Sequence, residues 1–283
     1  MKQKYFAVTY SDFIKFDAKP NEDFYLVSKK FPIFTVADGV TQSHYKNGEY
    51  AFPKGAKETA EIFCYKTIEY LEKQLDFKKP IEKEIKNSIK EAFDFSDKKI
   101  KELNIRYGID KKLNYIEYDW FDTVGVAGII LKNKIYYGYV GDCGLAIFDE
   151  NNKLKFQTKD EVAPAVKRFR EMYKNWKDFP QEKRTLIIHR DFRNNPDKKG
   201  YGSFTGEEGV QDYYKLGIKE LKNNDLIVFY SDGFCELLKD KNFVKILKEK
   251  NRKKLDNFIL QKAKENVQKY GHDRTFIAVK IGA

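Results

Sequence analysis

The sequence is poor in the residues that bind zinc or form disulfide bridges, with three cysteines and three histidines among 283 residues. Cys64, Cys143 and Cys235 lie far apart along the chain and form no closely spaced pair. An odd number of distant cysteines is not typical of a secreted disulfide framework, and their spacing fits no zinc module. We therefore expect three small buried residues, and neither a zinc enzyme nor a cysteine nucleophile.

Long apolar runs are also missing. No run approaches the ~20 residues that a membrane-spanning helix needs, and the segment Met1–Ala7 contains no apolar signal core. Hydrophobic residues nevertheless make up 41% of the chain and aromatic residues 16%, which is enough to build a core and argues against disorder. We expect a soluble, cytoplasmic globular protein with no membrane partner.

Motifs for nucleotide binding, internal repeats and linkers are absent as well. The sequence has no G-x-G-x-x-G after a strand-like run and no Walker sequence, so nucleotide-binding functions lose support. It shows no repeat with a period of about 20–50 residues, and no stretch is rich in glycine, serine and proline together. We therefore expect a single domain over residues 1–283.

Positive charge is in excess, with 54 lysines and arginines against 43 aspartates and glutamates and a net charge of +11. The excess is densest in residues 239–269, where lysines alternate with apolar residues at helical spacing. This spacing is typical of amphipathic helices with solvated lysine faces. A nucleic-acid-binding surface is the less favoured interpretation, and a general attraction for anionic phosphate groups agrees with either one.

Strand-like and helical patterns come in blocks along the chain. Helical periodicity covers roughly residues 53–75 and 81–104, and two further helices are expected between 234 and 270. Strands are expected at 6–10, 24–29, 33–37, 124–131, 134–140, 145–148, 154–157, 186–189, 226–230 and 275–281. Blocks of strands separated by pairs of helices favour antiparallel sheets with helices packed outside, rather than alternating βαβ units.

Acidic residues recur where apolar strands begin or end. Asp38, Asp142 and Asp232 each follow an expected strand with a glycine beside them. Asp273 and the pair Glu22-Asp23 stand just before a strand. If these strands share one core, the carboxylates project into one rim.

Such a cluster of carboxylates lowers the stability of the fold unless a cation binds there. Two like charges 4 Å apart repel by roughly 4 kcal/mol at an effective dielectric constant near 20. A divalent cation turns this repulsion into attraction, and ligand sets made only of oxygen select hard ions such as Mg²⁺, Mn²⁺ or Ca²⁺. The alternative is that each Asp-Gly pair is simply a turn after a strand.

The ordered motifs resemble those of the metal-dependent type 2C protein serine/threonine phosphatase (PPM) family. The segment 35–40, Thr-Val-Ala-Asp-Gly-Val, is similar to the V-A-D-G-M of that family, and Ser231-Asp232-Gly233 is similar to its S-D-G. Each motif is short, but together they follow the order of the family along almost the whole chain. The other matching segments are 21–23, 48–51, 122–125, 140–144, 158–160 and 272–275.

The resemblance implies both a fold and an activity. The fold is α+β, a four-layer α/β/β/α sandwich of two antiparallel sheets with helix pairs outside, and residues 163–209 occupy the place of a variable flap. The activity is hydrolysis of phosphoserine and phosphothreonine by a water that a binuclear Mg²⁺ or Mn²⁺ centre activates. Phosphorylated proteins are the implied substrates and a cognate serine/threonine kinase system the implied signalling partner.

The family also assigns roles to the acidic residues. Asp38 is expected to bridge both ions and so to be central to catalysis. Asp232 and Asp273 are expected to bind the first ion, and Glu22 and the carbonyl of Gly39 the second.

Three further acidic residues match supporting positions in the family. Asp142 matches a weaker third ion site, and Glu236, four residues after Asp232, is a second candidate ligand for it. Asp23 is expected to orient the metal ligands rather than to bind an ion.

The sequence departs from the family where phosphate is gripped and the leaving group protonated. The family places an arginine at the position of Ala18, and the adjacent Lys19 is a candidate replacement without bidentate geometry. His44 matches a histidine that donates a proton to the leaving group, although an exposed loop histidine is the alternative. The arginine after the V-G-D motif is lost, since Gly144 stands there.

These departures leave a second function open, a regulatory or phosphoprotein-binding module that keeps the fold with little or no turnover. The flap-like segment 163–209 carries several arginines that either contact an acidic phosphopeptide or form ordinary surface charge. They are Arg168, Arg170, Arg184, Arg190 and Arg193.

Overall fold

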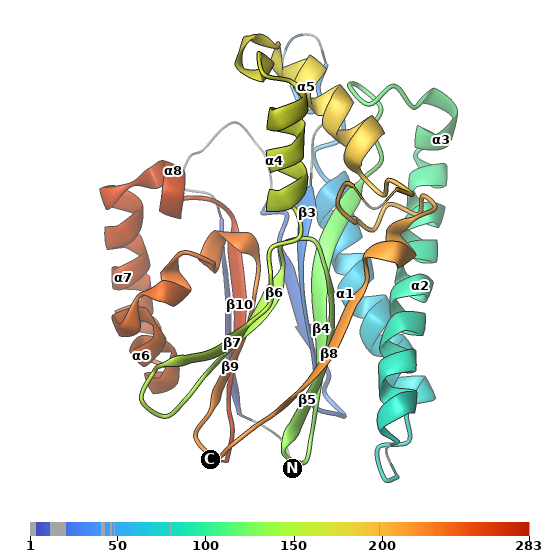
Figure 1. Cartoon of the computed structure of the whole chain (residues 1–283). Coiled ribbons are helices and arrows are strands. Elements are labelled where there is room, and N and C mark those ends of the chain that lie inside the picture. The colour runs from blue at the N-terminus through green and yellow to red at the C-terminus, as the bar shows by residue number, and fades with distance from the viewer. Residues whose placement is uncertain are drawn as a thin grey trace.

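The computed structural model describes residues 4–11, 21–40, 43–45, 47, 49–79, 81–197 and 199–282. Two five-stranded antiparallel sheets pack face to face at its centre (Figure 1). The first sheet has the order β2-β3-β4-β5-β8. Its strands are β2 (Phe24–Val27), β3 (Ile33–Val40), β4 (Asp122–Leu131), β5 (Lys134–Val140) and β8 (Lys215–Glu220).

The second sheet has the order β1-β10-β9-β6-β7, and all of its pairings are antiparallel as well. Its strands are β1 (Tyr5–Tyr10), β10 (Arg274–Lys280), β9 (Leu226–Tyr230), β6 (Gly144–Phe148) and β7 (Leu154–Gln157). A turn around Asn152, which has a left-handed φ of 64°, joins β6 to β7.

Alternating side chains of the strands form separate cores on the two faces of each sheet. On β3, Phe34 and Val36 face the other sheet, whereas Ile33 and Ala37 face the helices. The ring of Phe34 stacks on Phe229 of β9 with centroids 5.5 Å apart, which joins the two sheets. Both faces of the strand are covered, so its apolar run is nearly continuous rather than alternating.

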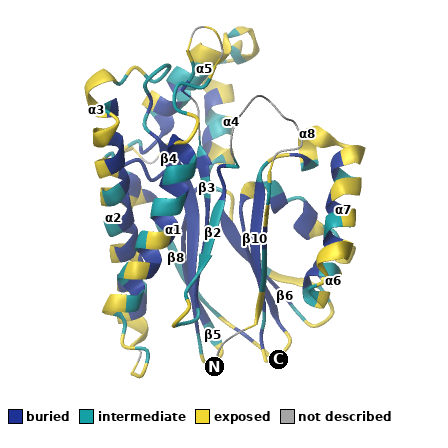
Figure 2. Ribbon diagram, turned by 180° about the vertical axis from the view of Figure 1, so that it is seen from behind, coloured by how far each residue is buried: buried dark blue, intermediate teal, exposed yellow. Residues whose placement is uncertain are grey.

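Helices cover the outer face of each sheet. α1 (Gly55–Gln74) and α2 (Glu82–Arg106) pack on the first sheet, and α6 (Lys241–Glu249) and α7 (Arg252–Glu265) pack on the second. Figure 2 shows exposed residues on the outer sides of these helices and buried strands between them. The expected four-layer sandwich of two antiparallel sheets and outer helix pairs is confirmed.

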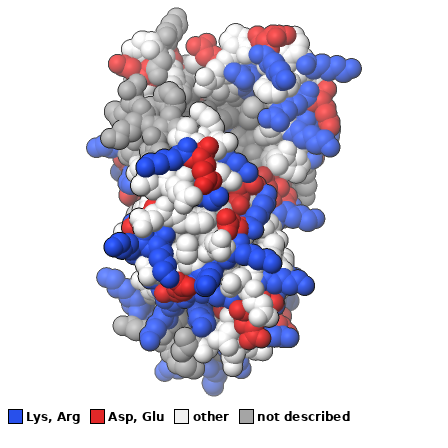
Figure 3. All heavy atoms as spheres, turned by 90° about the vertical axis from the view of Figure 1, so that its left-hand side faces the viewer, with Lys and Arg blue, Asp and Glu red and all other residues white. Residues whose placement is uncertain are grey.

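The lysine-rich stretch near the C-terminus forms α6, α7 and the short α8 (Val267–Tyr270). Their apolar positions point inward, where Phe243, Leu247 and Ile259 are buried. On the outer side, lysines and arginines are interspersed with acidic residues (Figure 3), and pairs such as Lys254 with Glu249 link them. No helix among the described residues is long and apolar enough to cross a membrane.

The flap-like segment folds into short helices above the strand ends. It contains α4 (Ala163–Met172), the 3₁₀ helix η1 (Trp176–Asp178), α5 (Gln181–Ile187) and the π-helix η2 (Ile188–Phe192). Figure 1 shows α4 and α5 beyond the end of the sandwich at which β3 ends and β6 begins.

One prediction for this segment is wrong, and one strand that follows it was missed. The strand expected at 186–189 is helical, because a four-residue apolar run does not distinguish a strand from a buried helical turn. Ile187 and Phe192 of this helical turn pack with Phe169 in a small core of their own. The strand β8 was not expected, because its residues are half-exposed and alternate with lysines at the edge of the sheet.

Short elements complete the chain. They are α3 (Ile109–Lys112) and the 3₁₀ turns η3 (Val210–Tyr213), η4 (Asp232–Phe234) and η5 (Leu237–Lys239).

Candidate functional site

The acidic residues at the strand ends lie at one end of the sandwich. β3, β5 and β9 end there, and β2 and β10 begin there, because every pairing in both sheets is antiparallel. The first sheet contributes Glu22 and Asp23 before β2, Asp38 within β3 and Asp142 after β5, and the second contributes Asp232 after β9 and Asp273 before β10.

Direct contacts tie the two sheets together at this end. The backbone N–H of Glu22 donates to Oδ2 of Asp273 at 3.1 Å. The Ser231 hydroxyl donates to Oδ2 of Asp23 at 2.6 Å and accepts from the backbone N–H of Thr275 at 2.9 Å. Ser231 therefore fixes the buried Asp23, a role that the sequence did not reveal.

Two glycines allow the acidic residues to approach one another. A Cβ on Gly39 would lie 2.3 Å from the carbonyl oxygen of Ala56 in α1 and 3.0 Å from that of Glu22. Gly141 has a φ of 79°, and a Cβ there would lie 2.3 Å from Val124. Glycine is required at both positions, which explains why it stands beside Asp38 and Asp142.

Burial and mutual repulsion raise the pKa values of the clustered carboxyl groups. Burial, followed by the charges of Asp232 and Asp273, raises the pKa of Asp23 to about 7, although the Ser231 hydroxyl opposes the shift. Burial and the charge of Asp232 raise the pKa of Asp142 to about 8. The pKa of Asp38 is raised well above its usual value by burial and by four carboxylates, those of Asp23, Asp232, Asp142 and Glu22.

The donor atoms of this cluster suit a divalent cation, but its side chains are not arranged around a common ion position. Its donors are carboxylate oxygens, which suit hard ions. Oδ1 of Asp23 is buried without a hydrogen-bond partner. Within the described residues, no three His, Cys, Asp or Glu side chains are already arranged around a common ion position. The residues therefore fit a cation by donor type and charge, and their oxygens would have to turn toward it.

A cavity of about 230 Å³ opens beside the cluster. Asp38, Asp142 and Asp232 line it together with Asp122 of β4. Its remaining wall is mainly apolar and comes largely from the flap-like segment: Val40, Val124, Val162, Ala165, Val166, Ile188, Phe192 and Tyr201, with His189 among them. Pockets for drug-sized ligands usually measure about 300–1,000 Å³, so this cavity suits one side chain rather than a long peptide.

The structure separates three predicted site residues from the cavity or does not describe them. Lys19 lies outside the described residues. His44 forms a β-bridge with Tyr50, and its ring packs on the Tyr50 ring with centroids 4.4 Å apart. Glu236, after η4, forms ion pairs with Lys239 and with Lys269, the latter at 3.3 Å. Neither His44 nor Glu236 is among the residues that line the cavity, and the same is true of Glu22, Asp23, Gly39 and Asp273 in the acidic cluster.

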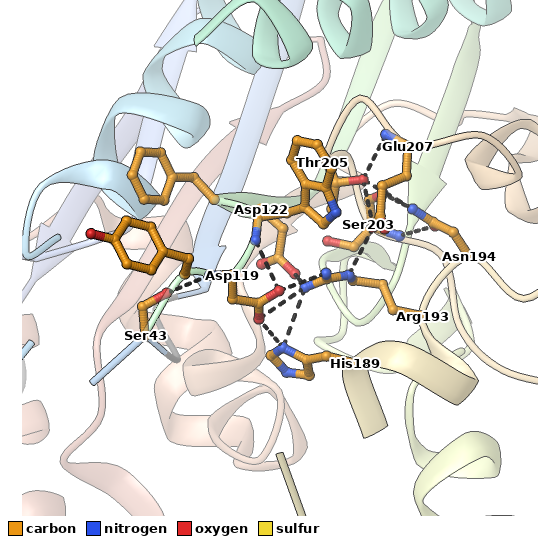
Figure 4. A network of polar contacts seen from close by, with 12 residues as sticks. Ser43, Asp119, Asp122, His189, Arg193, Asn194, Ser203, Thr205 and Glu207 are labelled. Carbon is orange, nitrogen blue, oxygen red and sulfur yellow. Dashed lines mark hydrogen bonds and ion pairs between the residues drawn. The ribbon is translucent and has the colours of Figure 1, made fainter. Parts of the chain in front are cut away.

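A buried ionic network borders the cavity on its other side (Figure 4). The Arg193 side chain is 0% exposed and contacts Asp119 at 2.8 Å, Asp122 at 3.1 Å and Glu207 at 3.1 Å. Nδ1 of His189 is hydrogen-bonded to Oδ2 of Asp119. The expectation that Arg193 is a surface or peptide-binding arginine is wrong, because three carboxylates hold it inside the protein.

Opposite charges set the pKa values in this network. Burial alone would raise the pKa of Asp119, but Arg193 and His189 outweigh burial and hold that pKa well below its usual range. Burial raises the pKa of Asp122 to about 6 against the opposing charge of Arg193. Little in the sequence indicates this network, since Arg193 and Asp119 are 74 residues apart.

The architecture matches solved structures of bacterial phosphatases over their full length. The serine/threonine phosphatase PstP of Mycobacterium tuberculosis aligns over 99% of this chain and 99% of its own, with a TM-score of 0.61 and 14% identity. Stp1 of Staphylococcus aureus aligns over 100% of this chain and 96% of its own, with a TM-score of 0.65 and 14% identity. A PstP catalytic domain in complex with two manganese ions aligns over 98% and 96%, with a TM-score of 0.57 and 14% identity.

Comparisons of sequence alone find no such likeness: no protein-family model matches the chain, and no curated protein matches it. At 14% identity the structural likeness concerns the fold. The resemblance to type 2C phosphatases that the motifs suggested is confirmed at this level.

Proposed function

We propose that this protein is a metal-dependent phosphatase that hydrolyses phosphoserine and phosphothreonine in proteins. The observation that carries the proposal is the gathering of six carboxyl groups from both sheets at one end of the sandwich, where Asp38, Asp142 and Asp232 line the cavity. The pKa values of Asp23, Asp38, Asp142 and Asp232 are all raised. Such a group of like charges is unfavourable by itself and becomes favourable with divalent cations. The shared fold of serine/threonine phosphatases supports the same reaction.

The residues that would hold two cations are those at the strand ends. Asp38 would contact both ions, Asp232 and Asp273 would bind the first, and Glu22 with the carbonyl of Gly39 would bind the second. The chemistry that bound Mg²⁺ or Mn²⁺ supplies is a water of lowered pKa and compensation of phosphoryl charge. The manganese found with the PstP domain supports this choice of metal.

The protein itself orients the acidic residues and supplies an apolar wall beside them. Ser231 holds Asp23, which in turn lies beside Asp232 and Asp273. Asp142 would support a weaker third ion, with Glu236 as the second candidate ligand. The apolar residues of the flap-like segment, such as Ile188 and Phe192, would contact the substrate beside its phosphate and exclude water.

The alternative is a phosphoprotein-binding module with little turnover. It is favoured by Ala18, which stands where the family has an arginine. A module would bind cations and phosphopeptides without releasing phosphate.

The test is phosphate release from a phosphothreonine peptide with Mn²⁺, compared with isothermal calorimetry of Mn²⁺ binding. We expect turnover that a chelator abolishes and that Asp38→Asn lowers by about a thousandfold, which corresponds to ~4 kcal/mol of lost transition-state stabilisation. Glu182→Gln, an exposed change on α5, is the control and should leave the rate unchanged. Cation binding by the wild-type protein without phosphate release would favour the module instead.

A further inference from the structure

His189 lies in the wall of the cavity although no motif pointed to it. We propose that His189, held by Asp119, donates the proton to the serine or threonine oxygen that leaves when the phosphoester is cleaved. This inference rests on the proposed function, because it assigns a step within that reaction. The juxtaposition that carries it is a buried histidine–aspartate pair in the same cavity as Asp38, Asp142 and Asp232.

The ring of His189 is held by one nitrogen and leaves the other available. His189 belongs to the π-helix η2 and is 7% exposed. Nδ1 is hydrogen-bonded to Oδ2 of Asp119 and also lies 3.3 Å from Nη1 of Arg193. Because the Asp119 carboxylate can only accept, we assign a proton to Nδ1, which makes it the donor to Asp119. Arg193 holds Asp119 in turn at 2.8 Å. Among the described residues, Nε2 has no hydrogen-bond partner, so it is the nitrogen that can serve a group in the cavity.

To act as this acid, the His189 ring must carry a proton on both nitrogens, and the Asp119 carboxylate on Nδ1 is placed to balance that positive charge. One guanidinium, that of Arg193, is shared by the carboxylates of Asp119, Asp122 and Glu207, so negative charge is in excess in the network. In the imidazolium form the ring has an acidic N–H at Nε2.

The reaction needs such a proton. Attack of water on phosphorus forms a new P–O bond and releases a proton, while the bond from phosphorus to the serine or threonine oxygen breaks. The electron pair of the broken bond stays on that oxygen, which would otherwise leave as a strongly basic alkoxide. Nε2 of His189 gives its proton to this oxygen, and the neutral imidazole then regains a proton from solvent. A positioned acid of this kind typically contributes ~10²–10⁴-fold.

The same step cannot be assigned to His44 from its surroundings. The backbone N–H of His44 donates to the carbonyl of Ile116, its ring packs on Tyr50, and it does not line the cavity. The two histidines are therefore distinguishable by substitution.

The experiment compares two substrates whose leaving groups differ in their need for a proton. Para-nitrophenyl phosphate releases a stable phenolate, whereas a phosphothreonine peptide releases an alkoxide. The variant is His189→Asn, because its amide N–H can replace Nδ1–H as the donor to Asp119 while Nε2 is removed. We expect kcat for the peptide to fall ~100-fold or more, and kcat for para-nitrophenyl phosphate to fall less than about 10-fold.

Other outcomes have distinct meanings. Equal losses on both substrates, or no loss on either, would overturn the role of His189. A split between substrates in His44→Asn instead of His189→Asn would also overturn it. If the wild-type protein hydrolyses neither substrate with Mn²⁺, the proposed function itself fails.

A measurement without turnover tests the pair directly. In the cation-free protein, proton NMR should show the Nδ1 proton of His189 far downfield, as expected for a strong hydrogen bond to a carboxylate, and His189→Asn should remove that signal. An Nδ1 without a proton would overturn the proposal. Equal melting temperatures of the wild type and His189→Asn establish that the variant is folded, and His189→Gln provides a second variant that lacks the ring.

Discussion

Two acidic regions border the same cavity, and they handle their charge in opposite ways. The cluster at the strand ends gathers six carboxyl groups, and the pKa values of Asp23 and Asp142 rise to about 7 and 8. The network around Arg193 balances Asp119, Asp122 and Glu207 with a buried guanidinium. The first region is unfavourable until something positive binds, whereas the second is largely satisfied by the chain itself.

This difference in charge balance indicates that the acidic cluster is a binding site, whereas the network around Arg193 supports the structure beside it. A folded protein tolerates a group of like charges when a ligand relieves it, because the uncompensated state lowers stability. An internal ion pair needs no ligand and fixes the position of the elements that it joins. Here Arg193 follows the π-helix of the flap-like segment, and two of its partners lie at β4: Asp119 precedes that strand and Asp122 begins it. The network therefore anchors the segment that walls the cavity.

Removal of Arg193 should give the largest effect on stability. Arg193→Met keeps an apolar stem but leaves Asp119 and Asp122 buried without their cation. We expect the free energy of unfolding to fall by ~3–5 kcal/mol, the usual cost of breaking a buried ion pair from one side. Urea denaturation at pH 7 measures it.

The matched control is Arg190→Met, on the same helical turn but with an exposed side chain that pairs only with its neighbour Asp191 among the described residues. It should change stability by less than ~1 kcal/mol. Equal losses in the two variants would mean that the network around Arg193 anchors nothing.

The acidic cluster should make the cation-free protein less stable as pH rises. An aspartate in the unfolded chain has a pKa near ~3.9, whereas that of Asp23 is about 7 and that of Asp142 about 8 in the fold. Between these values the folded state binds more protons than the unfolded state, so stability falls with rising pH. We expect a loss of ~1 kcal/mol per pH unit from pH 5 to 8, measured by urea denaturation.

Saturating Mg²⁺ serves as the comparison for this pH series. The cation takes the place of the protons on the cluster, so the slope should become shallower. Asp97, far from the cluster on α2, also has a pKa raised to about 7 by burial, and its contribution should persist with Mg²⁺. A slope that Mg²⁺ leaves unchanged would contradict the assignment of the cluster as a cation site.

The sequence predicted the fold and the acidic cluster because both leave local signals. The apolar runs that end at Asp38-Gly39 and Asp232-Gly233 indicate both a buried strand and the residue at which it ends. Glycine is required at position 39 because a side chain there would collide with the backbone of Ala56. Antiparallel order then brings such ends together without further information. The long helices α1 and α2 were visible for the same reason, since their periodicity extends over many residues.

The network around Arg193 could not be predicted in this way. Its members come from segments 70 or more residues apart, His189 from Asp119 by 70 and Arg193 from Asp119 by 74. No spacing along the chain encodes that meeting. The apolar run at 186–189, which was predicted to be a strand, is helical and places His189 in the cavity wall. The wrong prediction of a strand is therefore also the reason why His189 was not recognised as a site residue.

The smallest effect is expected at Glu236. Its spacing from Asp232 suggested a metal ligand, whereas its contacts are those of a surface residue. Its carboxylate pairs with Lys239 and Lys269, and it is 40% exposed. Such exposed pairs contribute ~0–1 kcal/mol, so Glu236→Gln should change stability by less than ~0.5 kcal/mol.

Asp142, by contrast, lies in the cavity with a pKa raised by burial and by Asp232. Asp142→Asn should therefore weaken Mn²⁺ binding more than Glu236→Gln does, which calorimetry measures. If Glu236→Gln weakens binding as much as Asp142→Asn does, the lysines must release Glu236 when the cation binds, and the weaker third ion site then includes both residues.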